Sequence, residues 1–232
     1  MPVGLISGSV SSEAAAVLFD FDGTLANTFP RAERAFPRLA REFRFRDPGP
    51  NALAELRDLP ARRILAELGI PWWKIPLVVW RARSLMASDP EPVEFFPGIP
   101  ELLAELDGRG RRWGILTSNG HGFVRRALLE AGLPEPGWLE AGVGLSGKTA
   151  RLRQFLSAWS LRPEELVYVS DETRDLEAAR AAGIGFEAVG WGYNTPQALE
   201  RAGARAVARD ASALRRALLG EGDARGNADI QA

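Results

Sequence analysis

The sequence predicts an α/β protein with a three-layer core around a parallel β-sheet and an inserted α-helical cap. Short apolar runs that end in polar or small residues alternate with helical segments from about residue 95 onward, which is typical of a doubly wound parallel sheet. Before that, residues 28–94 have helical composition throughout, although a crossover between two parallel strands does not need so many helices. We therefore expect a Rossmann-like core that carries the helical stretch as an insertion.

The expected strands of the core are short apolar runs. Residues 17–19 are wholly apolar and precede Asp20 and Gly23, as in a buried parallel strand that ends in a tight turn. The later runs cover residues 113–116, 166–169, 186–189 and 204–208.

The expected core helices have clear packing and end signals. Apolar residues at 152, 155, 156 and 159 form an i, i+3, i+4, i+7 stripe that can pack on a sheet. Residues 177–182 form a helix that ends at Gly183, and Thr195 followed by Pro196 begins one that ends at Gly203.

The helices expected in the cap are separated by proline and glycine. Trp73 and Trp80 lie seven residues apart, so we expect both in the interior of the cap. Lys74, Arg81 and Arg83 are interpreted as a solvated charged face. The expected helices cover residues 31–43, 52–56, 61–68 and 72–86.

These patterns define the domain organisation. The core is expected at residues 15–27 and 95–220, the cap at residues 28–94, and a flexible tail at residues 221–232. A chain of 232 residues has room for one α/β domain of ordinary size and a smaller insertion.

Composition excludes several classes of function. The 29 basic and 30 acidic residues nearly balance, so no basic face predicts nucleic acid or an anionic membrane as partner. The absence of cysteine excludes thiol catalysis and cysteine-bound zinc, and a single histidine excludes a histidine-rich metal site. We see neither a signal peptide nor a run long enough to cross a membrane. We expect a cytoplasmic protein that binds a small molecule, as a monomer or a homodimer.

The strongest chemical signal is the sequence FDFDGTL at residues 19–25. Asp20 and Asp22 follow an expected strand directly, so both can face the crevice at the carboxyl edge of the sheet. An ionised aspartate can attack phosphorus without a separate base, and a second can move protons. A carboxylate and a phosphate dianion repel each other, so this chemistry needs Mg²⁺. The competing interpretation is a surface turn with capping aspartates, which the preceding apolar strand disfavours.

Two further expected strands end in polar residues. Asp171 follows residues 166–169, and with Asp175 it can supply one metal ligand and one supporting residue. Asp175 can also stabilise the N-terminus of the next helix. Thr117, Ser118 and Asn119 follow residues 113–116 and offer hydroxyl and amide donors for phosphoryl oxygens.

The sequence GVGLSGKT at residues 142–149 satisfies the P-loop pattern of nucleotide-binding proteins. Residues 136–141 make a poor buried strand, whereas a P-loop must follow one, and a P-loop leaves Asp20 and Asp22 unexplained. Lys148 can instead act as a lone ammonium group that neutralises Asp20 and the phosphate.

With these four motifs in this order, the sequence resembles the haloacid dehalogenase superfamily, in particular phosphoglycolate phosphatase-like members with a helical (C1-type) cap. The resemblance implies that Asp20 is the nucleophile and a ligand of Mg²⁺. Asp22 would be the general acid and base and would offer its main-chain carbonyl to the metal. Asp171 would complete the metal site, with Asp175 behind it. The dehalogenase branch lacks the second aspartate, so Asp22 favours phosphoryl transfer.

The resemblance also assigns the phosphate-binding residues. Thr117, with Ser118 and Asn119, would bind the phosphate, and Lys148 would be the motif lysine. Family members usually have glycine before the metal-binding aspartate, whereas this chain has Ser170, whose side chain could crowd the turn.

The resemblance thus predicts a Mg²⁺-dependent phosphatase that hydrolyses a small phosphorylated metabolite, such as phosphoglycolate, through an aspartyl phosphate. A phosphomutase of the same fold would use the same aspartates. The sequence also leaves open a P-loop nucleotide hydrolase and a non-catalytic binding protein on this fold.

Overall fold

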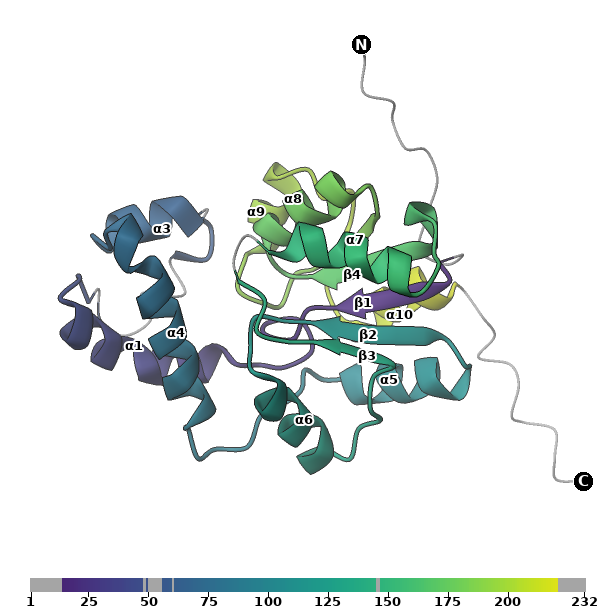
Figure 1. Ribbon diagram of the computed structural model, residues 1–232, viewed down its shortest axis with the longest axis horizontal. Helices are drawn as coiled ribbons and strands as arrows, with labels where there is room; N and C mark the ends of the chain where they lie inside the picture. Colours follow the sequence, from purple (N-terminus) through teal and green to yellow (C-terminus); the bar gives the residue numbers. More distant parts are fainter. Residues whose placement is uncertain (1–13, 48, 50–55, 60, 145–146, 221–232) are drawn as a thin grey trace, which may run out of the picture.

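The computed structural model describes residues 14–47, 49, 56–59, 61–144 and 147–220. It contains a six-stranded sheet in the order β3-β2-β1-β4-β5-β6, in which every neighbouring pair is parallel. Figure 1 shows β3, β2, β1 and β4 side by side. The strands are β1 (Ala16–Phe19), β2 (Arg112–Leu116), β3 (Trp138–Glu140), β4 (Leu166–Ser170), β5 (Gly185–Val189) and β6 (Val207–Ala208).

Strand β1 is central, and its two faces pack against different helices. Val17 and Phe19 belong to one apolar cluster, together with residues of helices α5 (Ile99–Gly108), α6 (His121–Glu130) and α10 (Ala211–Leu219). Ala16 and Leu18 belong to the other cluster, with α7 (Lys148–Ala158) and α8 (Thr173–Ala182). This alternation with a period of two places a helical layer on each face of the sheet. The predicted three-layer α/β core is confirmed.

The second structural part is helical and lies beside the carboxyl edge of the sheet (Figure 1). It comprises α1 (Phe29–Phe43), α3 (Ala61–Glu67), the short 3₁₀ helix η1 (Trp72–Lys74) and α4 (Ile75–Ala87). The two connections to the core run side by side, because Ala26 bridges to Phe95 and the Asn27 amide donates to the Glu94 carbonyl at 2.8 Å. We keep residues 28–94 as the proposed cap.

Some elements differ in extent from those expected. The predicted strand at residues 204–208 is shorter, since only Val207–Ala208 pairs with β5. Strand β3, which the sequence did not predict, follows from pairing with β2 at the edge of the sheet. The predicted helix at residues 52–56 falls almost wholly outside the described residues, as do the proposed tail and residues 145–146 of the P-loop-like sequence.

The expectation of a tryptophan core in the cap is wrong. Trp73 is 64% exposed and Trp80 is 62% exposed, whereas Val78 on the same helix as Trp80 is buried. Spacing shows that two side chains share one face of a helix, but it does not show which face meets α1. Packing of α4 on α1 buries other residues instead.

Candidate active site

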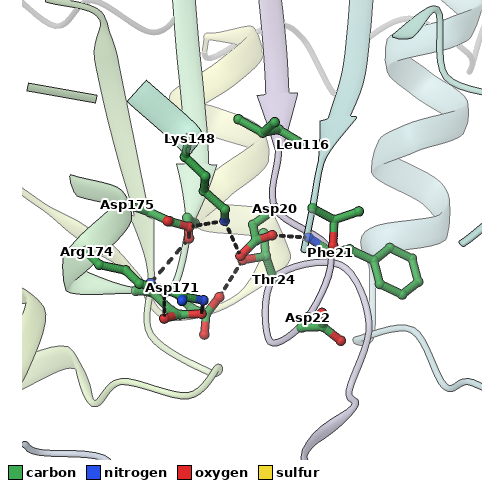
Figure 2. A network of polar contacts seen from close by, with 12 residues as sticks. Asp20, Phe21, Asp22, Thr24, Leu116, Lys148, Asp171, Arg174 and Asp175 are labelled. Atoms are coloured by element: carbon green, nitrogen blue, oxygen red, sulfur yellow. Dashed lines mark hydrogen bonds and ion pairs between the residues drawn. The ribbon is translucent and has the colours of Figure 1, made fainter. Parts of the chain in front are cut away.

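The predicted site residues come together where three neighbouring strands end. Asp20 follows β1, Thr117 follows β2, and Asp171 follows β4. The order of the strands reverses at β1, which is the position where open α/β sheets bind ligands. Figure 2 shows Asp20, Lys148, Asp171 and Asp175 gathered at this edge of the sheet.

Asp20 is held on both carboxylate oxygens. Its Oδ1 accepts the Phe21 amide at 2.8 Å, and its Oδ2 pairs with Lys148 Nζ at 3.0 Å. The Asp20 amide donates to the Val169 carbonyl, which continues the pairing of β1 with β4 by one residue. The side chain is therefore fixed in orientation, as a nucleophile must be.

The turn after Asp20 fits closely around Asp171. Gly23 has a φ of +74°, and a Cβ there would clash with the Asp171 carboxylate and the Tyr193 ring. Thr24 Oγ1 donates to Asp171 Oδ1 at 2.6 Å, and the Tyr193 amide donates to Asp171 Oδ2 at 2.6 Å. Only glycine allows the two strand ends to approach this closely.

Lys148 connects Asp20 to Asp175. Its ammonium group lies 2.7 Å from Asp175 Oδ2, as Figure 2 shows. It also donates to the Tyr168 hydroxyl at 2.8 Å. Burial acts to lower the pKa of Lys148, but Asp175 and Asp20 outweigh it and raise that pKa above its ordinary value. Burial likewise acts to raise the pKa of Asp175, but Lys148 and Arg174 hold it below its ordinary value. Lys148 and Asp175 are therefore both ionised.

Ser170 does not crowd the turn. Its hydroxyl donates to Asp175 Oδ2 at 2.6 Å, and the same oxygen accepts from Lys148 and, at 3.1 Å, from Tyr168. The serine side chain thus takes part in the network that holds the lysine. Asp175 Oδ2 thus accepts from three donors, as expected of a residue that orients the side chains around the site.

Asp22 and Asn119 face each other across the site. Asn119 Nδ2 donates to both carboxylate oxygens of Asp22, at 2.9 and 2.7 Å. Burial raises the pKa of Asp22, although hydrogen bonds from Thr28 and Asn119 oppose the shift. A raised pKa suits a group that must carry a proton to a leaving oxygen.

The other predicted phosphate-binding residues surround this pair. Ser118 and Asn119 line a cavity that opens at this end of the sheet. Thr117 is fully buried, and its Oγ1 accepts the Asn119 amide at 3.1 Å. Thr117 therefore shapes the loop that presents Ser118 and Asn119.

The cavity has a volume of about 600 Å³ and extends from Asp20 and Asp22 into the helical part. Its core side is polar and includes Asn119, Glu172 and Arg174. Its cap side is mostly apolar and is built from α1, α3 and α4 together with the connecting segments. The cavity thus has a charged floor and an apolar wall.

The acidic groups at the floor fit a Mg²⁺ ion. Burial raises the pKa of Asp20 well above its usual range, and Lys148 offsets this only partly. Burial and the charge of Glu172 also raise the pKa of Asp171, to about 7. A bound divalent cation would favour the ionised form of both carboxylates, and oxygen ligands are those that Mg²⁺ prefers.

No cluster of three or more acidic or histidine side chains with metal-binding geometry occurs in the described part of the chain. Two carboxylates and the main-chain carbonyl of Asp22 make up the proposed ligand set, so such a cluster is not required.

Comparison with known proteins identifies the family. Residues 17–189 match the family model of haloacid dehalogenase-like hydrolases. The chain belongs to this family. A phosphoglycolate phosphatase from Synechococcus elongatus is 32% identical over 79% of this chain and 87% of its own length. Another from Xylella fastidiosa is 31% identical over 84% and 87%, respectively. These matches confirm the predicted family and the predicted enzyme class, a phosphoric monoester hydrolase.

A solved structure supports the fold of this hydrolase. A haloacid dehalogenase-like family hydrolase from Streptococcus pneumoniae aligns with a TM-score of 0.72 and 21% identity, over 87% of this chain and 97% of that chain.

In the described residues, no helix is long and apolar enough to span a membrane.

The family also bears on the P-loop-like sequence. As expected, the residues before it make a poor buried strand, because Trp138–Glu140 form only the short edge strand β3, whose three residues are all partly exposed. Lys148 is directed at Asp20 and Asp175, whereas a P-loop lysine serves the phosphates bound by its own loop. The geometry therefore favours the lysine of a hydrolase.

Several residues of this hydrolase site were missed at the sequence level. Tyr168 lies within β4. Only the alternation of side chains between the two faces of the sheet could have indicated that it packs on the same side as α7. Tyr193 follows β5 in a glycine-rich loop, which is a signal for a loop at the same sheet edge. The interpretation of Arg83 as solvated is wrong, since it is half-buried and lines the cavity. By contrast, Arg81 pairs with Glu42 away from the cavity.

Proposed function

We propose that this hydrolase is a Mg²⁺-dependent phosphatase that cleaves a small phosphate monoester through an aspartyl phosphate on Asp20. The main support is the position of the Asp20 carboxylate. It is 3% exposed, adjoins Lys148, and lies at the end of a cavity that Asp22 also lines.

In the first step, a carboxylate oxygen of Asp20 bonds to phosphorus while the bond from phosphorus to the ester oxygen breaks. Asp22 gives its proton to that departing oxygen. In the second step, Asp22 takes a proton from water as the water oxygen attacks the same phosphorus. The bond between the Asp20 oxygen and phosphorus breaks, so inorganic phosphate leaves and the Asp20 carboxylate is restored.

The surrounding residues stabilise charge and hold position. Asn119 orients Asp22 through both carboxylate oxygens, and Lys148 provides positive charge next to Asp20. Thr117, Ser118 and Asn119 are proposed to donate to phosphoryl oxygens, together with Lys148.

Asp20, Asp171 and the main-chain carbonyl of Asp22 are proposed to hold the metal, with Asp175 behind them. When bound, Mg²⁺ supplies the positive charge that allows a carboxylate to approach a phosphate dianion. Thr24 and Tyr193 fix the Asp171 oxygens through hydrogen bonds.

The expected substrate is a small phosphorylated metabolite, and phosphoglycolate is the first compound to test because the two relatives described above are phosphoglycolate phosphatases. No feature of the site, as far as the described residues form it, favours a phosphomutase over a phosphatase.

The decisive experiment measures phosphate release from a panel of monoesters with purified protein, with and without Mg²⁺. We expect activity that a chelator abolishes and that Asp20→Asn reduces to background, because an amide oxygen cannot replace the carboxylate nucleophile. Asp107→Asn is the matched control, since Asp107 is exposed on α5, and it should keep full activity. Full activity in Asp20→Asn, or indifference to the chelator, would refute the proposal.

Metal binding can be checked without turnover. A ligand that binds only the folded state raises its stability. Mg²⁺ should therefore raise the unfolding temperature of the parent protein, and this rise should shrink in Asp171→Asn. An equal rise in both proteins would place the metal elsewhere.

A further inference from the structure

The cap side of the cavity differs from what a very small, highly charged substrate needs. A volume of about 600 Å³ falls in the range of sites for drug-sized ligands, roughly 300–1,000 Å³. The wall contains aromatic and aliphatic side chains such as Phe36, Leu39, Val79 and Met86. Apolar surface of this kind is stabilised when an apolar group displaces water from it.

Charge on the cap side is limited to two arginines among the described lining residues, Arg57 and Arg83. Arg57 is engaged by the core, because its guanidinium donates to the main-chain carbonyls of Gly192 and Tyr193. Arg83 has no hydrogen bond or ion pair within the described residues. It lines the same cavity as Asp20 and Asp22, so its charge is available to a phosphate bound at the floor.

Among the described residues, α1 and α4 offer no partner other than Arg83 for a charged group along this wall. Val78, Val79 and Ala82 on α4 face the same cavity as Ala32, Ala35 and Leu39 on α1. A carboxylate or a row of hydroxyls placed there would lose water without gaining hydrogen bonds from these side chains.

We propose that the preferred substrate is a phosphate monoester whose leaving group carries a hydrocarbon body of several carbon atoms, held against the apolar wall between α1 and α4. This inference rests on the proposed phosphatase function and names the substrate class for that site. Phosphoglycolate, whose leaving group is short and carries a carboxylate, is accordingly a poor substrate.

The test compares straight-chain alkyl phosphates from ethyl to octyl with phosphoglycolate. All the alkyl esters release a primary alcohol, so their intrinsic reactivity is similar and differences in kcat/KM report binding of the chain. Each methylene that the wall buries should raise kcat/KM about fourfold, until the cavity is filled. Phosphoglycolate should fall below hexyl phosphate.

A pair of variants on one helix locates the effect. Ala82→Leu adds bulk inside the cavity, so the best chain length should become shorter. Ser84→Leu adds similar bulk on the exposed side of α4 and should leave the profile unchanged. Both substitutions lie on α4, two residues apart. Ser84→Leu therefore controls for effects of added bulk on the helix itself.

The outcomes separate this inference from the function on which it rests. Hydrolysis of the esters with a profile that is flat in chain length, or with phosphoglycolate preferred, overturns the inference and leaves the phosphatase intact. A profile that Ala82→Leu does not change also overturns it. Failure to hydrolyse any ester overturns both.

Discussion

The two ends of the candidate active-site cavity are lined by different kinds of side chain, charged at one end and apolar at the other. At the core end, Asp20, Lys148, Asp171 and Asp175 are almost wholly buried, and each makes directed hydrogen bonds or ion pairs. At the cap end, the wall consists mostly of apolar side chains, which have no directional partners. Directed contacts fix the positions of reacting atoms, whereas apolar contacts select only shape and size. The core end therefore suits one kind of chemistry, and the cap end can change its substrate by a few substitutions.

The largest effect is expected from Lys148→Met, which keeps a long side chain but removes the charge between two buried carboxylates. Removing one partner of a buried ion pair costs about 3–5 kcal/mol of unfolding free energy. Phosphatase activity should also fall to background, because Asp20 loses its neighbouring cation. Denaturant unfolding and initial rates measure the two effects.

Lys74→Met is the matched control in the cap, where Lys74 donates to the Phe43 carbonyl and to no other group in the described part of the chain. It should cost much less stability. If Lys148→Met were as stable and active as Lys74→Met, the buried charge of Lys148 would not have the importance that the comparison of the two cavity ends gives it.

An intermediate effect is expected from Arg83→Gln, at the border between the two ends. A hydrogen bond to a charged group contributes about 1.5–3 kcal/mol, so kcat/KM should fall about 10- to 150-fold. The loss should be the same for ethyl and hexyl phosphate, since Arg83 is expected to meet the phosphate rather than the chain.

Arg81→Gln provides the comparison, because Arg81 pairs with Glu42 on the outer side of the cap. Its kinetics should match the parent. A loss in Arg83→Gln that grows with chain length would instead assign this arginine to the leaving group.

The smallest effect is expected from Ser170→Ala, which removes one donor from Asp175 and keeps the lysine. The free energy of unfolding should fall by about 1–3 kcal/mol, with a modest decrease in kcat. Ser157→Ala, at an exposed position on α7, should change stability less. An increase in activity on replacing Ser170 by alanine or glycine would restore the view that serine crowds the turn.

Much of the core, and the meeting of its proposed catalytic groups at one edge of the sheet, could be predicted from the sequence. The apolar run before Asp20 marks a buried strand, and the runs before Thr117 and Asp171 do the same. Parallel strands present their carboxyl ends at one edge, so residues that follow such runs must meet there. The apolar runs are enough for this prediction, because parallel strands all end at the same edge of the sheet.

The sequence did not determine which way individual side chains face. Trp80 and Arg81 on α4 point away from the cavity, while Arg83 lines it, although the same helix carries all three. The sequence also left open whether Lys148 serves a P-loop or Asp20, and what the Ser170 hydroxyl contacts. These choices depend on helix rotation and on partners that are distant in the chain. The sequence by itself determined which chemistry gathers at the sheet edge, and only tertiary packing decided how it is held and what covers it.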